Sequence, residues 1–199
     1  MRPLPFFGGP AYANIFWTTY GLWVVLEMIG AFTTSLSQRG RKSRDKGSSR
    51  VLVLLTWIAI GLDFTLSFQF PQAAISWKRT SVFFIGIAFM LAGMALRFYS
   101  MSVLGRSFSY YIAVHSEQTV LEVGPYRYVR HPSYTGALMI FVGLGLALGN
   151  WAGLFALLAC IGAAYAYRIS VEESALAGAL GEPYQQYMRR TRRLVPFLF

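Results

Sequence analysis

The residues best suited to chemistry lie in one run near the middle of the chain, residues 124–136, with the sequence GPYRYVRHPSYTG. Pro132 has a fixed φ that suits the first turn of a helix, and it biases His131 toward an extended conformation. The backbone N–H groups that follow would then face a site with Arg130 and His131 at its mouth. A carboxylate or phosphate is the expected ligand of such a helix start. A basic cluster that only contacts lipid head groups fits these residues equally well.

A second chemical group follows about thirty residues later. Arg168 and Glu172 share one face if this segment is helical, and Glu173 is turned away by about 100°. Such a group can be a surface ion pair of little energetic value. The segment continues through Tyr184 and Tyr187 into an Arg-rich tail. An amphipathic piece that folds back on the membrane would bring these residues over the loop at 105–132.

We expect no metal site. Cys160 is the single cysteine of the chain, so a disulfide within the chain and a cysteine-built metal site are both excluded. The two histidines, His115 and His131, lie on one loop without acidic residues at suitable spacing and make a poor ligand set.

The elements that must position these groups are membrane helices. Of the 199 residues, 55% are hydrophobic and 13% are charged, whereas soluble domains have about 25% charged residues. We predict an all-α integral membrane protein with one membrane domain, residues 1–199, about five transmembrane helices, and a catalytic region at about 105–199. The spans are expected at about 11–36, 51–70, 82–104, 133–149 and 150–169. The last two form a helical hairpin because only Gly149 and Asn150 separate their apolar runs. The following loop and tail would cap the bundle and form the cofactor site.

The distribution of Lys and Arg predicts the orientation. The loops after the first and third spans and the tail hold most of the basic residues, whereas the other side has Arg2, Lys78 and Arg79. Basic loops stay in the cytoplasm, so we expect the N-terminus outside and the active site and C-terminus inside. The expected location is a bacterial or archaeal inner membrane or the endoplasmic reticulum. The basic residues that give the net charge of +10 lie between apolar runs. This placement favours contact with anionic membrane lipids over binding to nucleic acid.

Two acidic residues lie inside predicted spans, Glu27 in the first and Asp63 in the second. Charge at bilayer depth is costly, so each should face the bundle or a wet cavity. An interhelical hydrogen bond is the favoured interpretation, with a chemical role as the alternative.

Taken together, these motifs resemble the isoprenylcysteine carboxyl methyltransferase family and its bacterial and archaeal relatives. The resemblance covers about residues 100–199. It rests on residues 124–136, the hairpin, Glu172-Glu173, Gly181-Glu182-x-Tyr184-x-x-Tyr187 and Arg190-x-x-Arg193-Leu194-x-Pro196-Phe197.

The resemblance implies a membrane enzyme that transfers a methyl group from S-adenosylmethionine to a lipophilic acceptor, typically the carboxylate of a prenylated cysteine. Arg168 and Glu173 are the expected catalytic residues; Arg168 would orient the acceptor, with Arg190 as a second substrate contact. Relatives often carry His, Gln and His where this chain has Tyr110, Ala113 and Gln118. The residues expected at the cofactor are Gln118, Thr119, Val120, Leu121, Tyr126, Arg130, His131, Pro132, Ser133, Tyr134 and Glu172.

The chemistry agrees with methyl transfer to a carboxylate. A carboxylate is ionised at pH 7 and needs no general base, so positioning does most of the work. One alternative is a phospholipid or other amine N-methyltransferase, in which Glu173 would act as the base. Another is an NADPH-dependent membrane reductase of the sterol reductase type. Those proteins tend to carry Asn and an acid where this chain has Ser133 and Ala137. A lipid-binding scaffold without activity would require the order of motifs to be accidental.

Overall fold

The computed structural model describes residues 8–37, 47–105 and 120–195. This part of the chain is helical, as predicted, and contains two isolated backbone bridges in place of a sheet. Its elements are α1 (Pro10–Ser37), α2 (Ser48–Gln69), η2 (Pro71–Ala73), α3 (Arg79–Leu104), η4 (Gly124–Arg127), α4 (Pro132–Leu148), α5 (Trp151–Leu180) and α6 (Glu182–Arg190), where η marks a 3-10 helix.

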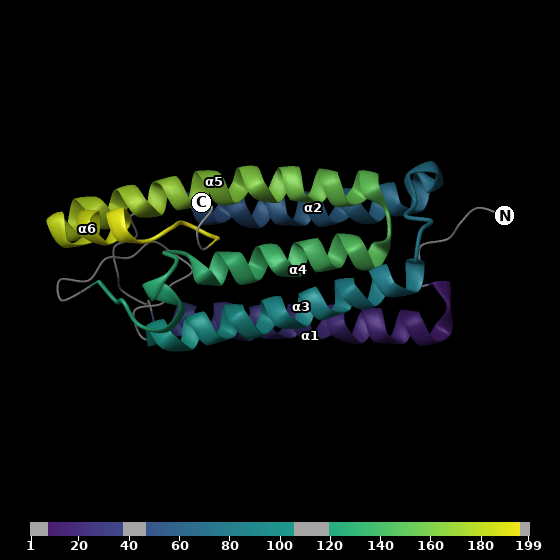
Figure 1. Cartoon of the computed structure of the whole chain (residues 1–199), viewed down its shortest axis with the longest axis horizontal. Coiled ribbons are helices and arrows are strands. Elements are labelled where there is room, and N and C mark those ends of the chain that lie inside the picture. The colour runs from purple at the N-terminus through teal and green to yellow at the C-terminus, as the bar shows by residue number, and fades with distance from the viewer. Residues whose placement is uncertain (1–7, 38–46, 106–119, 196–199) are drawn as a thin grey trace.

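The five long helices run along one common axis (Figure 1). Helix α4 lies in the centre with α3 and α5 on its two sides, while α1 runs beside α3 and α2 beside α5. Successive helices run in opposite directions. The ends of α1, α3 and α5 and the starts of α2 and α4 therefore meet at one end of the bundle, which also carries η4 and α6. We call it the site end.

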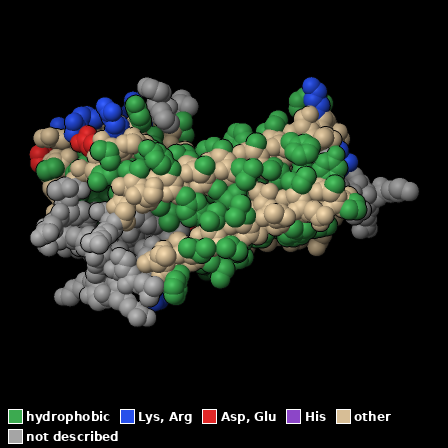
Figure 2. All heavy atoms as spheres, turned by 90° about the horizontal axis from the view of Figure 1, so that it is seen from below, with side chains coloured by type: hydrophobic (Ala, Val, Ile, Leu, Met, Phe, Trp, Pro, Cys, Tyr) green, Lys and Arg blue, Asp and Glu red, His purple; other side chains and the backbone are tan. Residues whose placement is uncertain are grey.

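Four of these helices are long and apolar enough to cross a membrane, namely α1, α2, α3 and α5. Helix α4 is apolar and has 17 residues, or about 25 Å, at the lower limit for a span. Hydrophobic side chains cover the middle of the molecule, and the charged ones gather at its two ends (Figure 2). Helix α5 has 30 residues, or about 45 Å, and so continues well past the predicted span of 150–169.

The α4–α5 hairpin is confirmed at the predicted residues. Gly149 ends α4 with a φ of 71°, a conformation that glycine adopts without steric cost. Asn150 caps α5, because its side-chain oxygen accepts a hydrogen bond from the Gly153 amide at 3.1 Å. The same side chain donates to the Phe70 carbonyl at 2.8 Å. The hairpin turn is thereby fixed to the end of α2.

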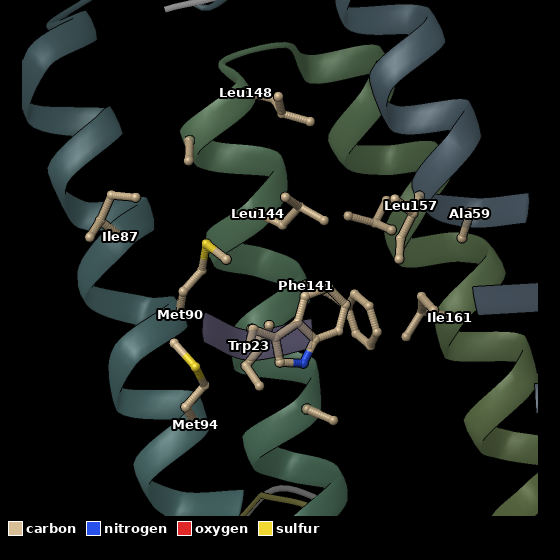
Figure 3. Packing of buried hydrophobic residues seen from close by; sticks show 14 of the residues in the cluster. Trp23, Ala59, Ile87, Met90, Met94, Phe141, Leu144, Leu148, Leu157 and Ile161 are labelled. Atoms are coloured by element: carbon tan, nitrogen blue, oxygen red, sulfur yellow. The ribbon is translucent and has the colours of Figure 1, made fainter. Parts of the chain in front are cut away.

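All five long helices contribute to one hydrophobic core around α4 (Figure 3). Trp23 of α1 meets Phe141 of α4 edge to face, with 5.6 Å between ring centroids. Met90 and Leu144 pack from α3 and α4, and Leu157 from α5. The core is continuous from α1 to α5, so it holds the site-end termini of the helices in fixed relative positions.

Helices α3 and α4 approach so closely that glycine is required between them. A Cβ atom on Gly136 would lie 2.7 Å from the Arg97 amide nitrogen and 2.7 Å from the Gly93 carbonyl oxygen. We therefore expect Gly136→Ala to destabilise the protein by about 1–3 kcal/mol, the usual cost of overpacking. The matched control is Gly162→Ala on α5, where a Cβ would meet no atom within 4 Å. Thermal melting in detergent measures both, and equal melting temperatures would contradict the prediction.

Asp63, one of the two acids inside the predicted spans, is fully buried on α2 beside Gly153 of α5. Its carboxyl oxygens and the Ser67 hydroxyl have no hydrogen-bond partner among the described residues. The expected interhelical hydrogen bond of Asp63 is therefore absent from this part of the structure. Asp63 also does not line the cavity at the site end of the bundle.

Candidate functional site

The site end of the bundle encloses a cavity of about 330 Å³. Its polar lobe lies where η4, the start of α4, the end of α5 and α6 meet. The residues that define the polar lobe are Tyr126, Arg130, His131, Tyr134, Glu172, Tyr184 and Tyr187. A charged, aromatic lining of this kind suits a ligand that carries charges of both signs.

The cavity continues between the membrane helices as an apolar lobe. It is lined there by Trp23, Val24, Met28, Val53, Trp57, Ile60 and Phe141. Ile60 lies twelve residues along α2, so the lobe reaches about 18 Å past the start of that helix. Met28 of α1 and Trp57 of α2 line the lobe and are also 66% and 60% exposed. The apolar lobe therefore opens sideways, toward the lipid-facing surface.

Arg168 and Glu172 are brought together through a tyrosine on the neighbouring helix. The Tyr134 hydroxyl donates to Glu172 Oε2 at 2.6 Å and accepts from Arg168 Nε at 3.3 Å. Arg168 is almost fully buried, and its Nη1 also donates to the Ser48 hydroxyl at 2.6 Å. Glu172 forms no ion pair with any described residue. Glu172 thus lines the cavity with a carboxyl group that the Tyr134 hydroxyl contacts and that no described cation pairs with directly.

Glu173 behaves differently from its neighbour. It does not line the cavity, and its side chain is 5% exposed. One oxygen accepts from Arg130 Nε at 2.7 Å and lies 3.2 Å from His131 Nε2, and the other accepts from Arg193 Nε at 3.1 Å. These contacts favour a role in fixing the segment before α4 over the catalytic role predicted from the sequence.

The start of α4 lies where Pro132 predicted it, but its N-terminus is less open than expected. The amides of Tyr134 and Thr135 both donate to the His131 carbonyl, at 3.0 and 3.1 Å. The Thr135 bond is the ordinary first i→i−4 bond of an α-helix, so only the Tyr134 amide is removed from the predicted set of open donors. The His131 ring stacks on Tyr134 with 5.4 Å between centroids. His131 and Tyr134 thus line the cavity as a stacked pair.

The tail folds back over this segment, as predicted. Arg130 and His131 donate their amides to the carbonyls of Arg192 and Arg193, at 2.7 and 3.0 Å. The Tyr187 hydroxyl donates to the Tyr126 carbonyl at 2.7 Å. Burial raises the pKa of Tyr187 to about 12, so this hydroxyl remains a donor at neutral pH. The tail thus forms part of the wall of the polar lobe.

The other predicted site residues divide into three groups. Val120, Leu121 and Ser133 line the cavity, and Pro132 is buried at the start of α4. Gln118 and Thr119 lie outside the described residues, as do Tyr110 and Ala113. Arg190 does not line the cavity; its side chain is 61% exposed and pairs with Glu122 at 2.8 Å.

Arg97 and Ser48 are two further site residues that were not predicted from the sequence. Arg97 lines the cavity and forms a two-point ion pair with Glu27, which confirms an interhelical contact for that acid. Arg97 could have been identified from the sequence, because Glu27 and Arg97 each place a charge inside an apolar run. Ser48 gives no such signal. Among the described residues, no group of three or more His, Cys, Asp or Glu is placed to hold a metal ion.

Comparison with known proteins decides the family. The sequence model of the phospholipid methyltransferase family matches residues 81–182, which run from the start of α3 to the start of α6. The chain belongs to this family. The matched residues of this phospholipid methyltransferase family member include most of the polar lobe and exclude α1 and α2.

Curated relatives of this family member carry a more specific name. The protein-S-isoprenylcysteine O-methyltransferase of Schizosaccharomyces pombe is 30% identical over 132 residues, covering 65% of this chain and 56% of the relative. A probable protein-S-isoprenylcysteine O-methyltransferase of Oryza sativa subsp. indica is 28% identical over 152 residues, covering 75% and 78%. The chain thus spans little more than half of the fission yeast relative.

A solved structure confirms the fold. The eukaryotic intramembrane Ras methyltransferase, isoprenylcysteine carboxyl methyltransferase, superposes with a TM-score of 0.64. The match covers 96% of this chain and 69% of the solved one, at 22% sequence identity. The match therefore extends the shared fold to the membrane helices that lie outside the family match.

Proposed function

We propose that this protein transfers a methyl group from S-adenosylmethionine to the carboxylate of a lipophilic acceptor, with a prenylated cysteine as the acceptor class. The observation that carries the proposal is one cavity that joins a charged, aromatic lobe to an apolar lobe open toward lipid. The names of the relatives support the same acceptor.

The polar lobe fits S-adenosylmethionine, whose sulfonium and ammonium groups are cationic. Glu172 supplies a carboxylate without an ion pair to a described residue, and the rings of Tyr126 and Tyr184 line the same lobe. An acid together with aromatic rings is a favourable environment for such cations. When bound, S-adenosylmethionine would supply an electrophilic methyl group.

The chain's own contribution is to position the acceptor. Arg168 lines the cavity, and a guanidinium can hold a carboxylate in a fixed orientation. Because that carboxylate is already ionised at pH 7, no side chain has to remove a proton. Tyr134 and Ser48 hold two donor positions of Arg168 and so restrict how its side chain can turn.

Methylation of a lipid amine is the second candidate, and the family name favours it. A protonated amine must first lose a proton to a base. Among the residues that the structure describes, the acids that line the cavity are Glu27, engaged with Arg97, and Glu172, which accepts from Tyr134. Glu173 is held by Arg130, Arg193 and the His131 ring and does not line the cavity. This arrangement favours a carboxylate acceptor.

The test is calorimetric titration in detergent with S-adenosylhomocysteine and separately with NADPH, followed by transfer of a labelled methyl group. Two acceptors are compared: N-acetyl-S-farnesylcysteine and phosphatidylethanolamine. We expect binding of S-adenosylhomocysteine and labelling of the farnesylcysteine. Labelling of phosphatidylethanolamine alone would establish the amine reaction, and binding of NADPH alone would overturn methyl transfer.

We further propose that the site end faces the cytoplasm, on the basis of the loop charges. Arg127, Arg189 and Arg192 are exposed there, whereas Lys78 and Arg79 lie at the opposite end. A tag placed after residue 199 should resist protease added to sealed cells and become sensitive after permeabilisation. Cleavage in sealed cells would reverse the proposed orientation.

A further inference from the structure

The cluster of Glu27, Arg97 and Ser133 joins three helices beside the cavity. Arg97 of α3 donates from Nε and Nη2 to the two carboxylate oxygens of Glu27 on α1, at 2.5 and 2.9 Å. Its Nη1 donates to the Ser133 carbonyl at 3.2 Å and to the Ser133 hydroxyl at 3.0 Å. Ser133 belongs to the first turn of α4, beside His131 and Tyr134 of the polar lobe.

The cluster fixes the position of α1, a helix that lines the apolar lobe. Helix α1 lines the cavity with Tyr20, Trp23, Val24, Glu27 and Met28. Glu27 is the charged one among them, and both of its carboxylate oxygens accept from Arg97; none of the five belongs to the polar lobe. The packing of α1 on the rest of the bundle near this level is between rings and aliphatic side chains, such as Trp23 against Phe141. Burial of such side chains favours packing but does not by itself fix one position of the helix. A two-point guanidinium–carboxylate pair fixes both distance and orientation.

We propose that Glu27 is a positioning residue, which acts through Arg97 to hold the α1 wall of the apolar lobe in register with the first turn of α4. The lipophilic part of the acceptor lies against that wall, while the reacting carboxylate must reach the polar lobe. This inference rests on the proposed function and deepens it. A shift of α1 would weaken binding of the acceptor much more than binding of the cofactor.

The test is Glu27→Gln, which keeps the shape of the side chain and removes its charge. We expect the KM for N-acetyl-S-farnesylcysteine to rise at least tenfold, while the Kd for S-adenosylhomocysteine changes less than threefold. Glu27→Asp, which retains the carboxylate, should recover most of the loss. The matched control is Ile29→Ala, an exposed residue of the same helix that does not line the cavity, and it should behave as wild type.

The remaining outcomes are also decisive. The positioning role of Glu27 would be overturned if Glu27→Gln left the acceptor KM unchanged, or if it weakened acceptor and cofactor binding equally. In either case, turnover by the wild-type protein would still support the proposed function. Wild-type protein that neither binds S-adenosylhomocysteine nor methylates the acceptor would overturn the proposed function itself. If Glu27→Gln fails to fold, Arg97→Lys gives the same comparison, because lysine keeps the charge and cannot form the two-point pair.

Discussion

Replacing Glu172 with Gln should weaken the binding of S-adenosylhomocysteine by at least about tenfold. Glu172 is the carboxylate that faces the cavity without an ion pair to a described residue, so a bound ammonium or hydroxyl group would lose a charged partner. Hydrogen bonds to charged groups contribute about 1.5–3 kcal/mol, which corresponds to a tenfold to hundredfold change in affinity. The Tyr134 hydroxyl can still donate to the amide oxygen, so the local fold should persist.

The control for this experiment is Glu182→Gln, the same chemical change at an exposed position on α6. Isothermal titration in detergent measures both variants against wild type. Wild-type affinity in Glu172→Gln would remove this residue from the cofactor site. The polar lobe would then have to bind the cofactor by other groups.

Replacing Arg168 with Lys should reduce kcat/KM for a carboxylate acceptor by about a hundredfold, with little change in cofactor affinity. Lysine keeps the positive charge in this buried position but cannot contact Ser48, Tyr134 and a carboxylate together. A misplacement of about 1 Å at the reacting groups is enough for a loss of this size.

Steady-state kinetics with N-acetyl-S-farnesylcysteine test the prediction, beside titration with S-adenosylhomocysteine. Arg189→Lys, an exposed arginine on α6, is the matched control. If Arg168→Lys lost affinity for the cofactor and the acceptor equally, Arg168 would belong to the cofactor site. If Arg168→Lys turned over at the wild-type rate, Arg168 would have no role in the reaction.

The bounds of several helices could be predicted from local sequence. Pro132 and Gly149 fixed the bounds of α4 because proline and glycine act on the backbone at their own positions. The length of the apolar runs predicted the membrane helices for the same local reason. The spacing of Arg168 and Glu172 placed both on one helix face, and both line the cavity.

The pairing of side chains between distant helices could not be predicted in this way. Glu27 and Arg97 are 70 residues apart, and their contact depends on how α1 rotates against α3. Glu172 and Glu173 look equivalent in the sequence. One helical step turns Glu173 toward Arg130 and the tail, and leaves Glu172 facing the cavity. Local patterns determine which residues are helical, whereas tertiary packing determines which of two adjacent acids is available to a ligand.

The return of the tail has a consequence for biosynthesis. The wall of the polar lobe includes Tyr184 and Tyr187, and the segment before α4 is bonded to Arg192 and Arg193. The cofactor site is completed only when the chain has been made to about residue 195. A prematurely terminated chain that lacks the residues after α5 would therefore lack part of the wall of the polar lobe, where the proposed cofactor would bind.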